Sequence, residues 1–282
     1  MGTIDYWCNA FTEDRRSMWD AALEEQGLSV KVRRDPQDSF ASASAMLERM
    51  NAIGVETLLL PSADIPEDAG RFAYERYTTS LPDVLRLARE HPGRFGGLWS
   101  IDPTRGSTGV RRAAEALEQT GFVGLHLHTH SFDRGFDHRD LYPFYALAAE
   151  RQVPMVMQAG ASGGLMPSAC GKPLAIDRPA LFFSDVNFVL SHTGWPWEDE
   201  AISMAGKHPN VYLGTAAFPP HHWSPELVRF LSGPGRGKTL FGTSFPVVGH
   251  RQALERLDAL ELSEETRTAL LEDTARHLFT CL

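Results

Sequence analysis

The sequence predicts one domain, residues 1–282, folded as a (β/α)8 TIM-like barrel of the α/β class. Short runs of apolar and β-branched residues alternate along the chain with segments whose apolar residues recur at the helical period. Eight such repeats in 282 residues, with no linker or low-complexity stretch, are typical of this barrel. A doubly wound open sheet is the competing fold, but it normally has fewer strands, and no glycine-rich GxGxxG or GxxxxGK loop follows a predicted strand.

The individual elements follow from these patterns. The eight predicted strands are residues 3–9, 55–60, 94–100, 122–128, 154–158, 187–191, 211–214 and 239–242. The predicted helices between them include residues 40–53, 82–90, 109–120, 141–152, 198–207 and 225–231, several of which end at a glycine suited to a left-handed cap. Helices 250–260 and 263–271 follow the last strand, and the second begins with Ser263 and two glutamates, an N-terminal capping signal.

Composition and charge exclude several classes of protein. A hydrophobic fraction of 43% and a charged fraction of 22% are ordinary for a globular chain, and no apolar run approaches the roughly 20 residues of a membrane span. Lys and Arg number 27 against 36 for Asp and Glu, so the basic field that nucleic-acid binding needs is missing. Residues 1–6 carry no secretory or myristoylation signal and three cysteines are too few for a disulfide framework, so we expect a cytoplasmic protein. Eleven histidines favour a metalloenzyme as the first hypothesis.

In a barrel of this kind, chemistry belongs at the carboxyl ends of the strands. Because strand side chains alternate between the interior and the helix layer, the apolar set Val123, Leu125 and Leu127 is predicted to face the helices. The interior set of the fourth strand is then Phe122, Gly124, His126, His128 and His130. The same rule sends Ile4, Tyr6 and Cys8 of the first strand outward and Asp5, Trp7 and Asn9 inward. Gln158, His192 and Ser244 end the fifth, sixth and eighth strands.

Four sequence segments resemble the amidohydrolase-related family, an ACMSD-like branch of the amidohydrolase superfamily that includes lactone hydrolases and aromatic-acid decarboxylases. They are residues 121–125 (GFVGL), 189–197 (VLSHTGWPW), 207–212 (KHPNVY) and 240–246 (LFGTSFP). The similarity covers nearly the whole chain in the same order. It implies a (β/α)8 barrel independently of the strand count, and barrels of this family often pair, so a homodimer is an expectation from the resemblance.

The family's metal ligands are largely replaced in this chain. The resemblance aligns the strand-one motif Asp-x-His-x-His with Asp5-Tyr6-Trp7-Cys8-Asn9, the strand-five histidine with Gln158 and the strand-eight aspartate with Ser244. Only the strand-six histidine is retained, as His192. An indole N–H has no available lone pair, and amide or hydroxyl oxygens are poor zinc ligands. We therefore predict no metal cofactor, with a relocated zinc site at His126, His128 and His192 as the alternative.

These positions define the predicted site. His192 is the candidate general acid or base, with His126 and His128 as further catalytic candidates or as a buried polar network. The candidate substrate contacts are Trp7, Asn9, Gln158, Ser244, Trp195 and His221. Ser244 beside His192 also allows a nucleophile, although the GxSxG elbow is missing. His130, His138, His221 and His222 lie in loops where solvated side chains are the simpler interpretation, and the segment 218–223 either shapes a pocket or merely covers the barrel end.

The leading functional prediction is hydrolysis of a lactone, ester or amide in a small molecule that is aromatic or carboxylated. Decarboxylation of an aromatic or unsaturated carboxylate, as in the ACMSD-like relatives, is the first alternative. A binding protein that keeps the barrel without the chemistry is the second. The expected partner is a small molecule, with neither nucleic acid nor membrane.

Overall fold

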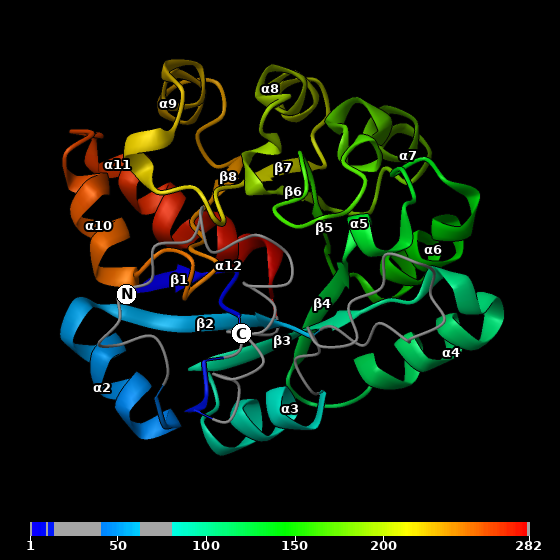
Figure 1. Cartoon of the computed structure of the whole chain (residues 1–282), viewed down its shortest axis with the longest axis horizontal. Helices are drawn as coiled ribbons and strands as arrows, with labels where there is room; N and C mark the ends of the chain where they lie inside the picture. Colours follow the sequence, from blue (N-terminus) through cyan, green and yellow to red (C-terminus); the bar gives the residue numbers. More distant parts are fainter. Residues whose placement is uncertain (1, 10, 14–40, 63–80, 281–282) are drawn as a thin grey trace.

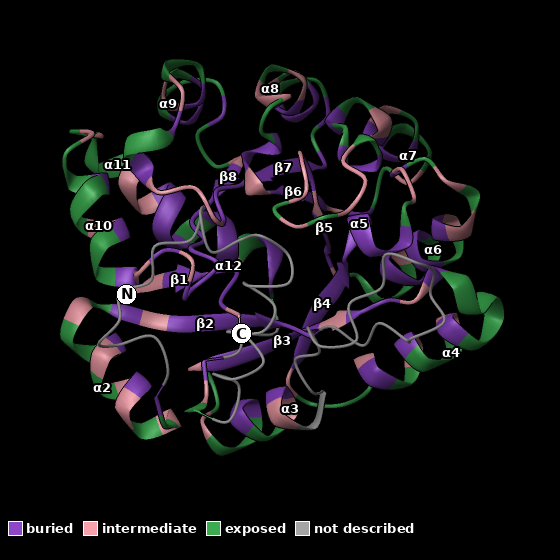
Figure 2. Ribbon diagram, viewed as in Figure 1, coloured by how far each residue is buried: buried purple, intermediate pink, exposed green. Residues whose placement is uncertain are grey.

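The computed structural model describes residues 2–9, 11–13, 41–62 and 81–280, and these form the predicted (β/α)8 barrel. Eight parallel strands make one sheet in the order of the sequence, and helices surround it (Figure 1). The strands are β1 (Thr3–Asp5), β2 (Val55–Pro61), β3 (Phe95–Ser100), β4 (Phe122–Leu127), β5 (Met155–Gln158), β6 (Phe188–Ser191), β7 (Val211–Gly214) and β8 (Thr239–Leu240). Buried residues concentrate on the strands, whereas the outer helix faces are exposed (Figure 2).

Contacts just beyond β1 and β8 close the sheet on itself. The backbone N–H of Tyr6 donates to the carbonyl of Phe241 at 3.1 Å, and that of Asn9 donates to the carbonyl of Phe245 at 2.9 Å. Between them, Cys8 pairs with Phe245 in parallel orientation. The segments that follow β1 and β8 therefore lie side by side.

The helices match most of the predicted ranges. They are α2 (Ala43–Ile53), α3 (Leu81–Glu90), α4 (Gly106–Leu117), α5 (Thr129–Phe132), α6 (Tyr142–Arg151), α7 (Asp177–Phe182), α8 (Glu198–Lys207), α9 (Pro225–Ser232), α10 (His250–Asp258), α11 (Glu264–Thr268) and α12 (Thr274–Leu278). Ser42 caps α2 through its side chain, and residue 40, where this helix was predicted to begin, lies outside the described residues. Ser263 caps α11 as predicted, but a π-helical turn at Ala269–Asp273 separates α11 from α12. None of the helices in the described ranges has the length and apolar character of a membrane span.

An apolar layer fills the barrel interior. Each of the eight strands contributes one residue to this cluster. In strand order they are Ile4, Leu59, Leu98, Val123, Val156, Val189, Tyr212 and Leu240. Alternate residues such as Met155 and Leu190 pack in a second cluster under the outer helices. Because strand side chains alternate, Gln158 and Ser191, two residues beyond Val156 and Val189, face the interior nearer the carboxyl ends.

The first strand differs from the prediction. Ile4 and Tyr6 belong to the interior cluster and do not face the helices, and β1 ends at Asp5 instead of Asn9. Tyr6 and Trp7 are consecutive, yet both join the interior cluster. The prediction treated apolar residues as helix-facing, but an apolar layer occupies the interior as well, so apolar character alone does not give the side-chain direction.

The fourth strand carries a register shift that reverses its first two residues. The pairing of β3 with β4 steps from Gly97↔Phe122 to Leu98↔Gly124, so Val123 is an extra residue in the ladder. Phe122 consequently packs outward and Val123 inward, the reverse of the prediction. Beyond this bulge, the predicted alternation holds, with Leu125 in the outer cluster.

Candidate active site

The predicted site residues lie at the carboxyl ends of the strands, where parity and resemblance placed them. Trp7 and Asn9 follow β1, His126 lies near the end of β4, and His128 follows that strand. Gln158 ends β5, His192 follows β6 and Ser244 follows β8, whereas Trp195 and His221 lie farther out in the loops after β6 and β7.

Trp7 is the centre of this group. Its ring meets the imidazole rings of His126 and His192 in edge-to-face geometry, with 4.9 Å between ring centroids in both pairs. The indole is 2% exposed, so both imidazoles contact a buried apolar surface. The structure thus brings together residues from β1, β4 and β6.

A ring of hydrogen bonds fixes the indole against the segment after β8. The indole Nε1–H of Trp7 donates to Asn9 Oδ1 at 3.1 Å, and Asn9 Nδ2 donates to the carbonyl of Ser244 at 2.9 Å. The backbone N–H of Ser244 returns a bond to the carbonyl of Trp7 at 2.8 Å. Ser244 has φ = 52°, and its buried hydroxyl has no hydrogen-bond partner among the described residues. Asn9 and the backbone of Ser244 therefore brace Trp7.

Loss of solvation controls the charge of both imidazoles that pack against Trp7, the buried His126 and the half-buried His192. Desolvation lowers the pKa of His126 to about 4, against the opposing effect of its hydrogen bond to the carbonyl of Ser62. Desolvation, followed by the charges of His130 and His126, lowers the pKa of His192 to about 3. Both rings are consequently neutral at pH 7.

Two further buried histidines extend the cluster. His128 Nδ1 lies 2.6 Å from Ser131 Oγ, and burial lowers the pKa of this imidazole well below its usual value. His130 is 3% exposed, not a solvated loop residue, and its Nε2 lies 3.0 Å from the carbonyl of Gly160. Its Nδ1 faces the side-chain amide of Gln158 at 3.5 Å. The alternate spacing of three histidines in the sequence was the signal for this placement.

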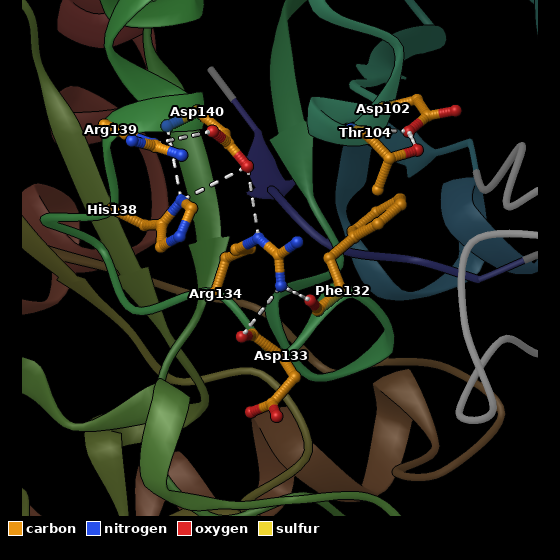
Figure 3. A network of polar contacts seen from close by, with 8 residues as sticks. All are labelled: Asp102, Thr104, Phe132, Asp133, Arg134, His138, Arg139 and Asp140. Atoms are coloured by element: carbon orange, nitrogen blue, oxygen red, sulfur yellow. Dashed lines mark hydrogen bonds and ion pairs between the residues drawn. The ribbon is translucent and has the colours of Figure 1, made fainter.

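A polar network holds the turn that follows His130. Arg134 donates to the carbonyl of Phe132 at 3.0 Å and pairs with Asp140 at 3.3 Å, and His138 Nδ1 accepts the N–H of Asp140 at 3.2 Å (Figure 3). His138 is thus part of a loop-fixing network between α5 and α6. This network keeps the short helix that carries His130 in place.

The loops after β5 and β6 are joined beside His130. Gly160 donates to the carbonyl of Gly171 at 2.7 Å, and Ala161 donates to the carbonyl of Trp195 at 2.7 Å. A Cβ on Gly171 would lie 2.1 Å from the carbonyl oxygen of Gly160, so no side chain fits there. These contacts fix the carbonyl to which His130 bonds.

The two outer candidates lie nearer to solvent. The Trp195 side chain is 54% exposed and its nearest aromatic neighbour is Phe218, with 6.1 Å between centroids. His221 is exposed, and its ring neighbour is His222 at 4.2 Å. Desolvation and then the charges of His222 and Arg256 lower the pKa of His221. The structure therefore places Trp195 and His221 at the rim and not against Trp7.

Asp5 lies in the seam between β1 and β8 instead of the barrel interior. Its carboxylate accepts from the hydroxyl of Thr243 at 2.5 Å and from the backbone N–H groups of Thr243 and Trp7 at 3.1 and 2.9 Å. His250 Nε2, at the start of α10, lies 3.0 Å from the same carboxylate. Asp5 thus joins β1, the segment after β8 and α10.

The donor set at the mouth does not fit the metal ion that the resemblance implies. The Trp7 indole nitrogen has no available lone pair, and the Asn9 amide oxygen, which accepts the indole N–H, is a poor zinc ligand beside imidazole or carboxylate. In the ranges that the structure describes, no group of three His, Cys, Asp or Glu side chains is arranged to hold a metal ion. The geometry of the described residues therefore gives no support to the relocated zinc site at His126, His128 and His192.

Comparisons with known proteins support the fold and the family. A family model described as amidohydrolase matches residues 4–280. No curated protein sequence matches the chain.

Similar solved structures cover nearly the whole chain. An uncharacterized TIM-barrel protein from Bordetella bronchiseptica has 21% identity and a TM-score of 0.80, covering 100% of this chain and 99% of its own. A 2,6-dihydroxybenzoate decarboxylase from Rhizobium has 16% identity and a TM-score of 0.71, with 99% of both chains covered. A dihydroxybenzoic acid decarboxylase from Polaromonas sp. JS666, with bound manganese and the inhibitor 2-nitroresorcinol, has 19% identity and a TM-score of 0.72, covering 99% of this chain and 97% of its own. At these identities the likeness establishes the barrel architecture.

Proposed function

Because the chain belongs to the amidohydrolase family, we propose that it removes the carboxyl group of a small aromatic carboxylate that carries a ring hydroxyl. The observation that carries this proposal is the pair of imidazoles, the buried His126 and the half-buried His192, that pack against one indole. The names of two similar structures favour decarboxylation over hydrolysis, which reverses the order of preference taken from the sequence.

The reaction needs a place for an aromatic ring and a source of one proton. The bond between the ring carbon and the carboxyl carbon breaks, its electron pair stays on the ring carbon, and CO₂ leaves. The same ring carbon takes up a proton. A ring hydroxyl beside the carboxylate assists, because hydrogen bonding from that hydroxyl to a base raises the electron density of the ring.

The residues around Trp7 can take these roles. The indole and the unpartnered Ser244 hydroxyl border the substrate, and Gln158, braced by His130, orients it. His126 accepts the hydrogen bond of the ring hydroxyl. When the carboxylate binds, His192 takes up a proton from water, since a nearby negative charge favours imidazolium. It passes this proton to the ring carbon and returns to the neutral form.

We propose that these side chains act without a metal ion, because the donor set at the mouth lacks the ligands for one. No step of the proposed reaction passes through a metal. The Ser244 hydroxyl acts as a hydrogen-bonding group, because no base is hydrogen-bonded to it in the described part of the chain.

The test is a substrate panel with two readouts. Purified protein is incubated with 2,6-dihydroxybenzoate, 2-hydroxybenzoate and benzoate, and released CO₂ is measured together with the phenolic product. A parallel panel of phenyl esters and lactones is run in ¹⁸O-water. We expect CO₂ from the hydroxybenzoates, a loss of about a hundredfold or more in His192→Gln, and no change in His222→Gln, an exposed histidine. Incorporation of ¹⁸O from the ester panel without CO₂ from the acids would favour hydrolysis instead.

A further inference from the structure

A chain of hydroxyl groups crosses the barrel interior behind His192. Tyr6 on one side of the barrel places its phenol oxygen 2.6 Å from Ser191 Oγ on β6, and Ser191 Oγ lies 2.8 Å from His192 Nδ1. Tyr6 and Ser191 are both 0% exposed. The two hydroxyl groups that connect to His192 are therefore shielded from water.

Two glycines, which carry no side chain, leave the space that the Tyr6 phenol occupies. A Cβ on Gly214, at the end of β7, would lie 2.1 Å from the Tyr6 oxygen, and a Cβ on Gly242, after β8, would lie 2.4 Å from its ring. Any other residue at either position would displace Tyr6. The position of Tyr6 is thus specified by two glycines that are far from it in the sequence.

The hydrogen-bond donor can be assigned in each of the two contacts, Tyr6–Ser191 and Ser191–His192. Among the described residues, Ser191 Oγ is the only hydrogen-bond partner of the Tyr6 hydroxyl, so the buried phenol hydrogen is directed to Ser191 Oγ. Ser191 then accepts from Tyr6, and its own hydrogen is directed to His192 Nδ1. A nitrogen that accepts a hydrogen bond in a neutral imidazole leaves the hydrogen on the other nitrogen.

The hydrogen bond of His126 selects the opposite tautomer. Its Nδ1 lies 3.1 Å from the backbone carbonyl of Ser62, which can only accept, so Nδ1 carries the hydrogen. Its Nε2 is buried and has no hydrogen-bond partner in the described ranges. That nitrogen is a bare acceptor on a ring that packs against Trp7.

We infer that Tyr6 and Ser191 hold His192 as the Nε2–H tautomer, while the Ser62 carbonyl holds His126 as the Nδ1–H tautomer. The two imidazoles that pack against the Trp7 indole then offer a ligand one hydrogen-bond donor and one acceptor. Tyr6 and Ser191 are positioning residues, because they act through His192. The ligand class that follows, an aromatic ring with a hydroxyl donor next to a carbonyl or carboxylate acceptor, rests on the proposed function. The tautomers themselves do not depend on it.

Long-range ¹H–¹⁵N correlation spectra of the full chain with ¹⁵N-labelled histidine test the tautomers directly, because a bare and a protonated imidazole nitrogen resonate far apart. The wild-type spectrum is expected to show bare Nδ1 and protonated Nε2 for His192 and the reverse for His126. Tyr6→Phe frees Ser191 Oγ to accept from His192, so the Nδ1–H share of His192 should rise about fivefold or more, the equivalent of one neutral hydrogen bond. The His126 pattern should stay unchanged.

A matched control and a second variant keep the test decisive. Tyr145→Phe removes another buried phenol hydroxyl, which donates to the carbonyl of Phe136 at 2.8 Å, and it should leave both histidine patterns as in the wild type. Ser191→Ala should mix the His192 tautomers as Tyr6→Phe does. A wild-type His192 with protonated Nδ1, or a wild-type His126 with protonated Nε2, would overturn the inference even if every variant failed to fold.

Binding of simple acids tests the ligand class. 2-Hydroxybenzoate should bind about tenfold or more tightly than 2-methoxybenzoate, which cannot donate to the bare Nε2 of His126, and His126→Ala should remove the difference. Equal affinities for the two acids in the wild type would contradict the assigned acceptor. Because the spectra are recorded without ligand, correct tautomers together with absent CO₂ release would refute the proposed function alone.

Discussion

Replacing His126 by asparagine should make the folded chain less sensitive to acid. His126 is fully buried and its pKa lies at about 4 in the folded protein, against about 6.5 for an exposed imidazole in the unfolded chain. Between these pH values the unfolded state binds a proton that the folded state does not. The contribution of neutral His126 to the free energy of unfolding is therefore fully present above pH 6.5 and is lost as the pH falls toward 4.

The magnitude follows from the two pKa values. Lowering the pH from 7 to 5 should remove about 1.8 kcal/mol from the free energy of unfolding through His126 alone, and a similar amount through His192. Asparagine keeps a side-chain N–H near the Ser62 carbonyl but does not titrate. The loss between pH 7 and pH 5 should therefore be about 1.8 kcal/mol smaller in His126→Asn than in the wild type.

Urea unfolding at pH 7, 6 and 5, followed by tryptophan fluorescence, measures this difference. His277→Asn is the control, because that side chain is exposed on α12, and this variant should show the same loss of stability between pH 7 and pH 5 as the wild type. The variant is compared with the wild type at each pH, which removes any constant cost of the substitution. Parallel curves for His126→Asn and the wild type would mean that His126 protonates in the folded state as it does in water, and would refute the picture of a dry, neutral histidine cluster.

The remaining predictions concern the seam, the mouth loops and the cofactor. Asp5→Asn removes the buried charge that His250 faces, so the free energy of unfolding should fall by about 3 kcal/mol in the same urea assay. Gly171→Ala forces a Cβ against the carbonyl of Gly160, and should cost about 2 kcal/mol of stability together with most of the CO₂ release, whereas Gly249→Ala, whose nearest atom is 3.9 Å away, should change neither. Dialysis against a chelator should leave CO₂ release unchanged, and restoration of a lost activity by added manganese would contradict a metal-free reaction.

The barrel itself was predictable because alternating strand and helix patterns need no tertiary information. The strand ends were equally accessible, so Gln158, His192 and Ser244 were found at the mouth. The positions of His126 and His128 followed from alternation, because the bulge in β4 lies before them.

Side-chain direction was predicted wrongly where the alternation breaks. Asp5 and Tyr6 exchange their predicted sides, because an apolar interior layer accepts Ile4 and Tyr6 and the Asp5 carboxylate finds Thr243 and His250 outside it. Nothing local in the sequence indicates this, since Thr243 and His250, the side chains that Asp5 meets, are more than 230 residues away. The hydroxyl chain from Tyr6 to His192 was missed for the same reason.

The most direct test of the proposed reaction follows the proton. The wild-type protein is incubated with 2,6-dihydroxybenzoate in D₂O, and the phenolic product is analysed by mass and NMR beside a reaction without protein. We predict one CO₂ for each resorcinol formed, with one deuterium at the carbon that carried the carboxyl group. Unchanged 2,6-dihydroxybenzoate, together with ¹⁸O incorporation into the acids released from phenyl esters, would contradict decarboxylation as the function of this barrel.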